Sequence, residues 1–270
     1  MGIDLPDQQS LAAELVDTRW HRVEVVDETG STNADLLARI DAGDDIDGTV
    51  LISGRQTSGR GRHARVWETP PGQLAISAAV RVRPEAIAHL GWLSLLTGLA
   101  VYDAVGEVAG TELELKWPND VLVPGGGKLS GILSEFRLTP GVDGAANGGV
   151  AVIGTGLNLD LPAGSAPDTA ASISGLVDGP VDRLAVAAAY LRALSAKLDA
   201  WPDRIPELAD GYRAVSATLG SRVRLVLPGD REVIGSAVDI DDEGRIVVDG
   251  ADGRITASAG DVTHLRPVGE

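Results

Sequence analysis

Cysteine is absent from this 270-residue chain, and lysine is nearly so, with three lysines against twenty arginines. Without cysteine there can be no disulfide, no thiolate metal site and no cysteine nucleophile. The histidines are scattered without the spacing of a metal site, at His21, His63, His89 and His264. No Gly-x-Ser-x-Gly nucleophile elbow occurs, and no carboxylate pair stands out. Any catalysis should therefore be positional and electrostatic, with no covalent enzyme intermediate.

Basic residues and long apolar runs are also scarce. Lysine and arginine total 23 against 39 acids, a formal net charge of −16, which argues against a surface that tracks a nucleic-acid backbone. The longest apolar stretch, residues 90–105, is interrupted by glycine and polar residues, so it predicts a buried helix rather than a membrane span. The first six residues have no basic segment followed by an apolar core. We expect a cytoplasmic protein with neither a nucleic-acid nor a membrane partner.

The order of the predicted elements favours an α+β fold. Hydrophobic periodicity predicts helices at residues 8–16, 31–40, 89–105, 182–201 and 206–214. It predicts strands at 21–27, 49–53, 74–82, 113–116, 129–136 and 150–159, with a glycine-rich surface turn at 139–149. Because strands and helices do not alternate strictly, we expect a mixed or antiparallel sheet flanked by helices.

The last fifty residues have a different pattern. Short strands separated by glycine or aspartate turns are predicted at 222–227, 232–239, 245–249, 254–257 and 262–265. Such even spacing is typical of a small β-barrel. We therefore predict two domains, residues 1–218 and residues 219–270.

Residues 54–65 contain four arginines and no acid, although the chain as a whole is acidic. Gly59 and Gly61 let the backbone bend and approach a ligand, while Arg60, Arg62 and Arg65 supply fork-shaped donors for carboxylate or phosphate. The surrounding stretch lacks periodicity, which predicts a long, mobile loop. A solvated turn or a disordered RNA contact is the alternative, but one such run in an acidic chain makes a poor nucleic-acid tract. The pattern favours an anion site.

Two of the three lysines, Lys116 and Lys128, lie twelve residues apart. In a chain that habitually uses arginine, a lysine indicates that a compact ammonium is wanted, for example against a developing oxyanion. The alternative is that both are ordinary surface lysines. The glycines before Lys128 do not form a Walker loop, because the first glycine is missing and Leu129 occupies the Ser/Thr position.

Two further segments have the composition of ligand-binding turns. Gly30-Ser31-Thr32-Asn33 lies at a predicted strand-to-helix junction, where hydroxyls and free backbone N–H groups grip small polar ligands, although most such segments are only helix caps. Residues 154–158, Gly-Thr-Gly-Leu-Asn, stand at the end of the apolar strand predicted at 150–159. They lack the third glycine and the helix of a dinucleotide fingerprint, which leaves a ligand role or a tight turn.

Five segments in order closely resemble the motifs of the biotin protein ligases: residues 30–33, 56–63 (Gln-Thr-Ser-Gly-Arg-Gly-Arg-His), 116–120 (Lys-Trp-Pro-Asn-Asp), 128–133 (Lys-Leu-Ser-Gly-Ile-Leu) and 154–158. The C-terminal barrel is similar to the SH3-like domain of that family. The resemblance implies a biotin/ATP-binding catalytic domain that joins biotin and MgATP into biotinoyl-5′-AMP. It also implies transfer of biotin to a lysine of the biotin carboxyl carrier domain of an acyl-CoA carboxylase.

The resemblance also assigns residues. It implies that biotin is bound by Ser31, Thr32, Asn33, Gln56, Gly59, Arg60, Gly61, Arg62, Lys128 and Gly131. It implies that the nucleotide is bound by Arg62, Arg65, Trp67, Asn119, Ile132, Gly154, Gly156 and Asn158. Lys128, Arg60 and Arg62 are the implied catalytic residues, and Asn119 and Asp120 the implied neighbours of Mg²⁺. The arginine loop would close over the ligands and keep water from the anhydride.

Several details qualify the resemblance. The family commonly has glycine where Ala64 stands, and a positive φ there would strain alanine. Only thirty residues precede Ser31, fewer than a winged helix-turn-helix domain needs, so we expect no DNA binding by that route. The chain lacks the acceptor sequence Ala-Met-Lys-Met, so it is not its own carrier. A monomer and a homodimer are both compatible with the sequence. The alternatives to the ligase function are a lipoate or octanoyl transferase, and a non-catalytic RNA-binding module.

Overall fold

The larger of two β-sheets in the computed structural model has seven strands in the order β1-β2-β3-β7-β6-β5-β4. The structure describes residues 5–62, 65–139, 148–162, 167, 169–227, 229, 231–258 and 260–264. β1 and β2 pair in parallel, and the other neighbours in this sheet are antiparallel. The strands are β1 (Arg22–Thr29), β2 (Thr49–Gln56), β3 (Gln73–Val82), β4 (Glu114–Lys116), β5 (Asp120–Leu122), β6 (Lys128–Leu138) and β7 (Gly149–Asn158).

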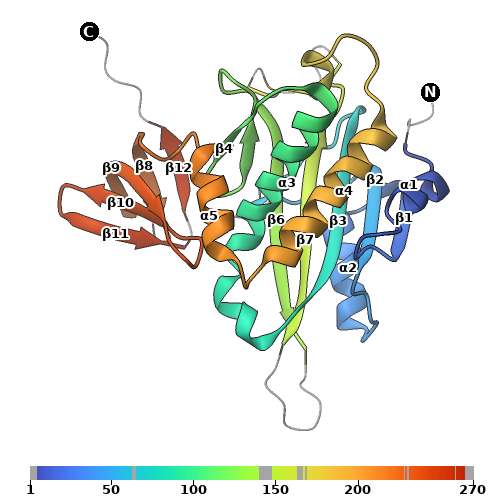
Figure 1. Cartoon of the computed structure of the whole chain (residues 1–270), viewed down its shortest axis with the longest axis horizontal. Coiled ribbons are helices and arrows are strands. Elements are labelled where there is room, and N and C mark those ends of the chain that lie inside the picture. The colour runs from blue at the N-terminus through green and yellow to red at the C-terminus, as the bar shows by residue number, and fades with distance from the viewer. Residues whose placement is uncertain are drawn as a thin grey trace.

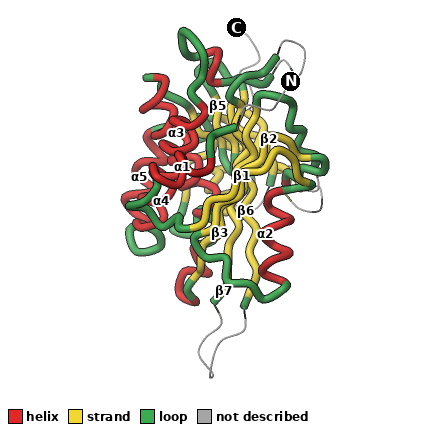
Figure 2. Tube along the Cα trace, turned by 90° about the vertical axis from the view of Figure 1, so that its right-hand side faces the viewer, coloured by secondary structure: helices red, strands yellow, loops and turns green. Residues whose placement is uncertain are grey.

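Helices cover both faces of this sheet (Figures 1 and 2). One face carries α1 (Gln8–Glu14), α3 (Trp92–Ala109), α4 (Arg183–Ala200) and α5 (Ile205–Ala214), whereas α2 (Thr32–Asp41) lies alone on the other face. By length and hydropathy α3 could span a membrane, but most of it is buried, because it packs against both the sheet and α4. A helix that is apolar nearly all round needs partners on most sides, and these two neighbours supply them.

Helix α2 is the crossover between the parallel strands β1 and β2, and its first turn helps to form the site described below. Ser31 is its N-cap, with the Ser31 hydroxyl accepting from the Ala34 N–H at 3.4 Å. The inner side of α2 packs on the sheet through a small separate core of Leu36, Leu37, Ile46, Leu51, Ala79, Val150 and Val152. This packing anchors the cap, so its polar residues are held in place.

The second sheet follows α5 and has five antiparallel strands in the order β11-β10-β9-β8-β12. They are β8 (Arg222–Leu227), β9 (Arg231–Ile240), β10 (Ile246–Gly250), β11 (Gly253–Ala257) and β12 (Asp261–His264). The turn between β9 and β10 accepts hydrogen bonds from two buried tryptophans of the part of the chain that contains the seven-stranded sheet. Trp92 donates to the Asp242 carbonyl at 2.9 Å, and Trp117 donates to the Gly244 carbonyl at 3.1 Å. These bonds tie the C-terminal sheet to the larger unit, beside the residues of the site.

The predicted fold class, a mixed sheet flanked by helices with a small C-terminal β-domain, is confirmed. Strand β5 was missed because three residues are too few for periodicity to register. The helix predicted at 89–105 begins three residues later, after a separate 3₁₀ helix at Pro84–His89, and runs on to Ala109. The tight turn considered for residues 154–158 is wrong, since these residues continue β7. Ala64, Leu265 and most of the turn predicted at 139–149 lie outside the described residues.

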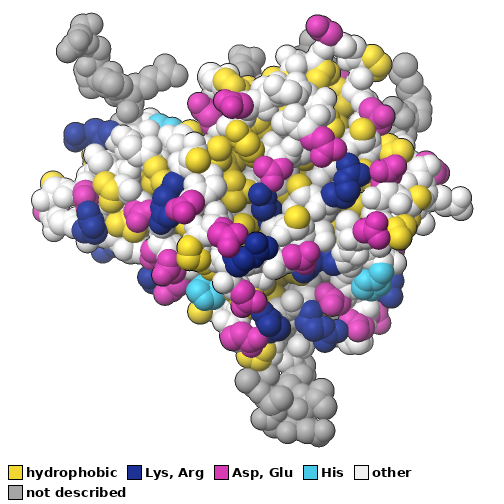
Figure 3. All heavy atoms as spheres, viewed as in Figure 1, with side chains coloured by type: hydrophobic (Ala, Val, Ile, Leu, Met, Phe, Trp, Pro, Cys, Tyr) yellow, Lys and Arg dark blue, Asp and Glu magenta, His cyan; other side chains and the backbone are white. Residues whose placement is uncertain are grey.

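Charge is mixed on the molecular face shown in Figure 3, where basic side chains alternate with acidic ones. Many charged side chains of this protein form exposed ion pairs, such as Arg192 with Glu14 and Glu107. Pairs of this kind contribute little stability individually.

Candidate functional site

A cavity of about 480 Å³ lies where the start of α2, the end of β2, the arginine loop, strands β5 to β7 and strand β12 converge. The residues predicted from sequence that line it are Ser31, Thr32, Asn33, Gln56, Arg60, Gly61, Arg62, Arg65, Trp67, Asn119, Asp120, Lys128, Gly131, Ile132, Gly154 and Gly156. Gly59 does not line it, but the Gly59 carbonyl accepts from the backbone N–H of Trp67, which does. Asn158 lines a second cavity next to the first one. Residues far apart in sequence thus form one site.

A neutral polar cluster forms one end of the cavity. The Gln56 carboxamide oxygen accepts from the Thr32 backbone N–H at 3.0 Å and lies 3.2 Å from the Thr32 hydroxyl. The Ser77 hydroxyl lies 2.7 Å from that of Thr32 and 2.6 Å from the Asn33 carboxamide oxygen. Ser31, Thr32 and Asn33 are each at most 4% exposed. Buried, mutually oriented donors and acceptors of this kind suit a small neutral polar group.

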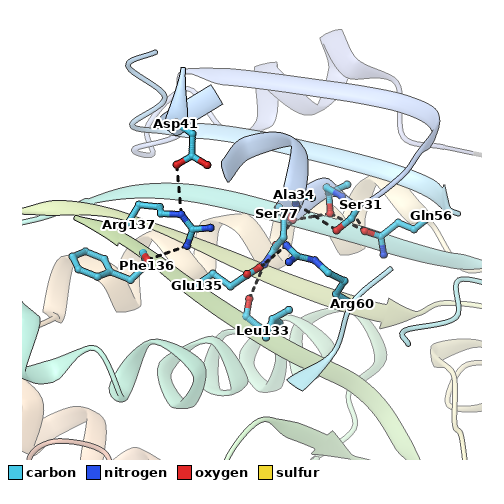
Figure 4. Close-up of polar contacts among 12 residues, drawn as sticks. Ser31, Ala34, Asp41, Gln56, Arg60, Ser77, Leu133, Glu135, Phe136 and Arg137 are labelled. Carbon is cyan, nitrogen blue, oxygen red and sulfur yellow. Dashed lines mark hydrogen bonds and ion pairs between the residues drawn. The ribbon is translucent and has the colours of Figure 1, made fainter. Parts of the chain in front are cut away.

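The arginines of the loop are each held by a different part of the protein. Arg60 pairs with Glu135 of β6 at 3.0 Å (Figure 4), and the same carboxylate oxygen accepts from Asn33 at 3.0 Å. Arg62 donates to the Asn119 side chain at 3.5 Å and to the Gly260 carbonyl at 3.3 Å. Arg65 forms an ion pair with Asp261 of β12. The first half of the loop is therefore tied to the large sheet, and the second half to the C-terminal sheet.

Arg62 is the most desolvated of these guanidinium groups. Burial lowers the pKa of Arg62, an effect that the nearby carboxylates of Asp261 and Asp120 partly offset. Because guanidinium stays protonated, burial leaves a weakly hydrated positive charge facing the cavity. Such a charge binds an incoming anion more strongly than an exposed one, since less water must be displaced and the local dielectric is low.

Lys128 is the first residue of β6 and lines the same cavity as the arginines. Its ammonium is 2.6 Å from the Asp120 carboxylate and 5.3 Å from the centroid of the Trp67 ring. The side chain is 35% exposed, so an ion pair and an aromatic face hold it without sealing it from ligands. The alternative that Lys116 and Lys128 are ordinary surface lysines is not supported, because both line the cavity.

Glycines form the floor of the cavity because side chains approach the strands too closely for anything larger. A Cβ at Gly154 would lie 2.3 Å from the Asn33 carboxamide oxygen. A Cβ at Gly156 or Gly131 would lie 2.3 or 2.7 Å from the Trp67 ring. The glycines of β6 and β7 are thus needed for close approach, rather than for a turn.

A second cavity of about 350 Å³ adjoins the first and shares Val66, Trp67 and Lys128 with it. Its other lining residues are Glu68, Pro70, Gln73, Asn158, Pro167, Thr169 and Ala170. The Asn158 amide donates to the Lys128 and Ala171 carbonyls at 3.1 and 2.9 Å, which fixes its orientation. The side-chain oxygens of Asn158 and Gln73 are buried and accept no hydrogen bond in the described part of the chain. These two oxygens are buried polar atoms without a donor at the wall of the second cavity.

Sequence reasoning missed several residues of the site. Ser77 and Glu135 lie within strands and carry no motif, so nothing in their sequence context distinguished them from other strand residues. Asp261 comes from the C-terminal sheet, more than one hundred residues from any motif, and only the fold brings it to Arg65. For Gln73 a signal did exist, because a polar residue at the start of an apolar strand is unusual where the neighbouring positions are buried.

Comparison with known proteins assigns this fold and site to a family. A family model described as the biotin/lipoate A/B protein ligase family matches residues 26–154. A second, described as the biotin protein ligase C terminal domain, matches residues 218–265. The chain therefore belongs to the biotin/lipoate A/B protein ligase family.

Its relatives narrow the class to biotin ligases. The chain is 46% identical over 266 residues to the biotin–acetyl-CoA-carboxylase ligase of Mycobacterium tuberculosis, a match that spans 96% of each chain. It is 32% identical over 244 residues to the ligase of the same name from Paracoccus denitrificans, covering 87% of this chain and 97% of the relative. The biotin protein ligase from Aquifex aeolicus in complex with biotin and ATP superposes with a TM-score of 0.73 at 25% identity, covering 92% of this chain and 100% of that one. The resemblance predicted from the five motifs is confirmed.

Proposed function

We propose that this protein is an ATP-dependent biotin protein ligase. In the first step, an oxygen of the biotin carboxylate attacks the α-phosphorus of ATP, and pyrophosphate leaves as biotinoyl-5′-AMP forms. In the second step, a lysine amine of a biotin carboxyl carrier domain attacks the acyl carbon, and AMP leaves. One observation carries the proposal: a single cavity joins a buried neutral polar cluster to a set of cations.

The neutral end suits the ureido ring of biotin, which offers one carbonyl acceptor and two N–H donors. Ser31, Thr32, Asn33 and Gln56 supply hydroxyl and amide groups that can match both kinds of bond. Gly131 and Gly154 let the Trp67 and Asn33 side chains pack closely against the strands, which shapes the walls of the cavity. Biotin bound in this way would direct its carboxylate toward Lys128 and the arginine loop.

The cationic end suits the joining of two anions. A carboxylate and a triphosphate repel each other, and Arg60, Arg62 and Lys128 would offset that repulsion by binding both. As the α-phosphorus is attacked, negative charge grows on its other oxygens, and preorganised cations stabilise that charge. Lys128 is the best placed, because Trp67 and Asp120 already fix its ammonium. No residue needs to become covalently attached.

The second cavity suits the nucleotide base. Trp67, Pro70 and Pro167 give it flat apolar walls, and Asn158 offers a buried acceptor to an exocyclic amine. The cavity adjoins Lys128, so a base bound there would direct its phosphates toward the cations. Trp67 lines both cavities and would contact both substrates.

Mg²⁺ is part of the proposal as the partner of ATP. In the described residues no three His, Cys, Asp or Glu side chains are grouped as a metal cage. Mg²⁺ usually keeps several waters and takes phosphate oxygens with only one or two protein oxygens, so such a cage is not required. Asn119 and Asp120 are the oxygen donors next to Lys128 and Arg62 that could complete its shell.

Pyrophosphate exchange tests the first step. We expect labelled pyrophosphate to enter ATP only when biotin and Mg²⁺ are both present. Exchange driven by lipoate or octanoate but not by biotin would instead indicate a lipoate or octanoyl transferase. A complete lack of exchange with any of these acids would refute the ligase function. The second step is tested by transfer of biotin to a purified carrier domain, and cell fractionation would test the expected cytoplasmic location.

Lys128→Ala tests the assignment of the reacting centre. We expect adenylate formation to fall by about a hundredfold or more, as for loss of one preorganised charge donor, while biotin affinity changes little. Lys197→Ala is the matched control, because Lys197 pairs with Asp103 on the helical face, away from the cavity. If the Lys128 variant formed adenylate at the rate of the Lys197 variant, the role assigned to Lys128 would be wrong.

A further inference from the structure

Glu135 is an acid in the middle of β6, on the face of the large sheet that α2 covers. Its cross-strand neighbour Val152 belongs to the small core under α2. Because side chains alternate along a strand, Glu135 projects to the same face as Gly131 and Leu133, which both line the first cavity. The Glu135 side chain is only 21% exposed. A carboxylate held out of water in this way is costly unless other groups bind it, so its partners indicate its role.

One oxygen of Glu135 binds both ends of the site. Glu135 Oε2 accepts from the Asn33 amide at 3.0 Å and pairs with the Arg60 guanidinium at 3.0 Å (Figure 4). Asn33 belongs to the neutral polar cluster, whereas Arg60 belongs to the arginine loop. Surface pairs of this protein differ, since in the pair of Arg192 with Glu107 the acid is 60% exposed. A shared and largely desolvated oxygen adds little net stability, which favours a role in the site.

The bond to Glu135 fixes which end of the Asn33 carboxamide faces a ligand. The Asn33 amide donates to Glu135 and to the Leu133 carbonyl at 3.1 Å, and neither partner can donate in return. Rotation of the carboxamide by 180° would therefore bring its oxygen against two other oxygens. Asn33 Oδ1 is directed instead toward the Ser77 hydroxyl and Gly154. An acceptor in this place suits an N–H group of the ureido ring.

The bond to Arg60 holds a cation at the other end without sealing it from ligands. Arg60 forms an isolated antiparallel bridge with Val66, which anchors its backbone, and its side chain is 44% exposed. The guanidinium can thus bind an anion while Glu135 limits the positions that it samples. Pre-organisation of this kind lowers the entropy lost when a charged side chain binds its substrate.

We propose that Glu135 is a positioning residue that couples biotin recognition to adenylate formation. The same carboxylate oxygen holds Asn33 for the ureido ring and Arg60 for the biotin carboxylate. Glu135 acts through these two side chains and does not itself touch the reacting atoms. The inference rests on the ligase function proposed above and adds to it a strand residue outside all five motifs.

Two substitutions separate the two bonds. Glu135→Gln keeps an oxygen for Asn33 but removes the charge that binds Arg60, whereas Glu135→Met removes both at similar length. Titration calorimetry measures biotin affinity, and pyrophosphate exchange at saturating substrates gives kcat. We expect Glu135→Met to weaken biotin binding by about fivefold to tenfold, the effect of one neutral hydrogen bond, and Glu135→Gln to restore it. Both variants should lower kcat by about tenfold, because Arg60 loses a charged hydrogen-bond partner.

Arg60→Met identifies the side chain through which Glu135 affects kcat. In the Arg60→Met variant, Glu135→Gln should lower kcat no further, because the charge has already lost its partner. Glu107→Gln and Glu107→Met are the matched controls, since Glu107 on α3 pairs with Arg192 on α4 at the same distance of 3.0 Å. Both controls should match the wild type in biotin affinity and in kcat.

The outcomes separate the role of Glu135 from the ligase function. Wild-type biotin affinity in Glu135→Met, wild-type kcat in Glu135→Gln, or additive losses with Arg60→Met would each overturn the coupling and leave the ligase function intact. Glu135→Gln is nearly isosteric, so it keeps the proposal testable if Glu135→Met does not fold. Absence of biotin-dependent exchange in the wild type would instead refute the proposed function itself.

Discussion

Gly154→Ala is the most direct test of how the site is built. Gly154 lies in the middle of β7, where an added Cβ would be 2.3 Å from the Asn33 carboxamide oxygen and 2.9 Å from its carbon. Asn33 cannot withdraw freely, because its amide donates to the Leu133 carbonyl at 3.1 Å and to Glu135 at 3.0 Å. Either the strand or the Asn33 side chain must move, and the polar end of the cavity moves with it.

The cost can be worked from these contacts. Overpacking a buried position costs about 1–3 kcal/mol, and loss of one Asn33 hydrogen bond adds about 1 kcal/mol. A protein of this size loses about 2–4 °C of melting temperature per kcal/mol, so we expect Gly154→Ala to melt roughly 5–15 °C lower. Calorimetry measures that shift. Biotin affinity, measured by titration calorimetry on the folded variant, should also fall, because Asn33 is displaced.

Gly106→Ala is the matched control for this change. Gly106 is an exposed glycine within α3, and a Cβ there meets no atom within 4 Å, so alanine should stabilise the protein by about 0.5–1 kcal/mol. Asn33→Ala completes a double-mutant cycle. Gly154→Ala should lower the free energy of unfolding much less in the Asn33→Ala variant than in the wild type. The reasoning fails if Gly154→Ala and Gly106→Ala melt at the same temperature. It also fails if Gly154→Ala destabilises the wild type and the Asn33→Ala variant equally.

Two further predictions concern pH. Burial lowers the pKa of His264 below its ordinary 6.5, and the positive charge of Lys116 lowers it further. As pH falls below about 6.5, His264 is therefore protonated in the unfolded chain before it is protonated in the folded protein, and the stability of the folded protein should decrease. His264→Gln should flatten that slope between pH 7.5 and 5.5 in urea unfolding, and an unchanged slope would contradict the assignment. The Arg39 guanidinium, bound to both oxygens of Glu24 at 2.8 and 2.7 Å, holds the pKa of that carboxyl below its usual 4.5. Arg39→Met should therefore lower the free energy of unfolding by about 0.5–1 kcal/mol at pH 7 but by less at pH 3, and equal losses at both would refute the pairing.

Much of the fold could be predicted because its elements carry strong local signals. The long apolar run of α3 and the cap at Ser31 identified both helices, since such runs and caps are local features of the sequence. The even spacing of short strands after residue 218 indicated the small β-domain in the same way. The strand predicted at 150–159 is β7, whereas β5 was not predicted, because three residues give no periodic signal.

The residues of the site also fall into two groups, those that the sequence indicated and those that only the tertiary structure brings to it. The sequence by itself indicated its chemistry through a neutral polar turn, an arginine loop and a lysine kept in an arginine-rich chain. The structure showed that the glycines of β6 and β7 allow side chains to approach these strands closely. Only the tertiary structure decided which other groups join them, such as Glu135 beneath Arg60, Asp261 against Arg65, and Gln73 opposite Asn158. These partners depend on strand register and on the contact between the two sheets. Such contacts join residues far apart in the chain, so no local pattern encodes them.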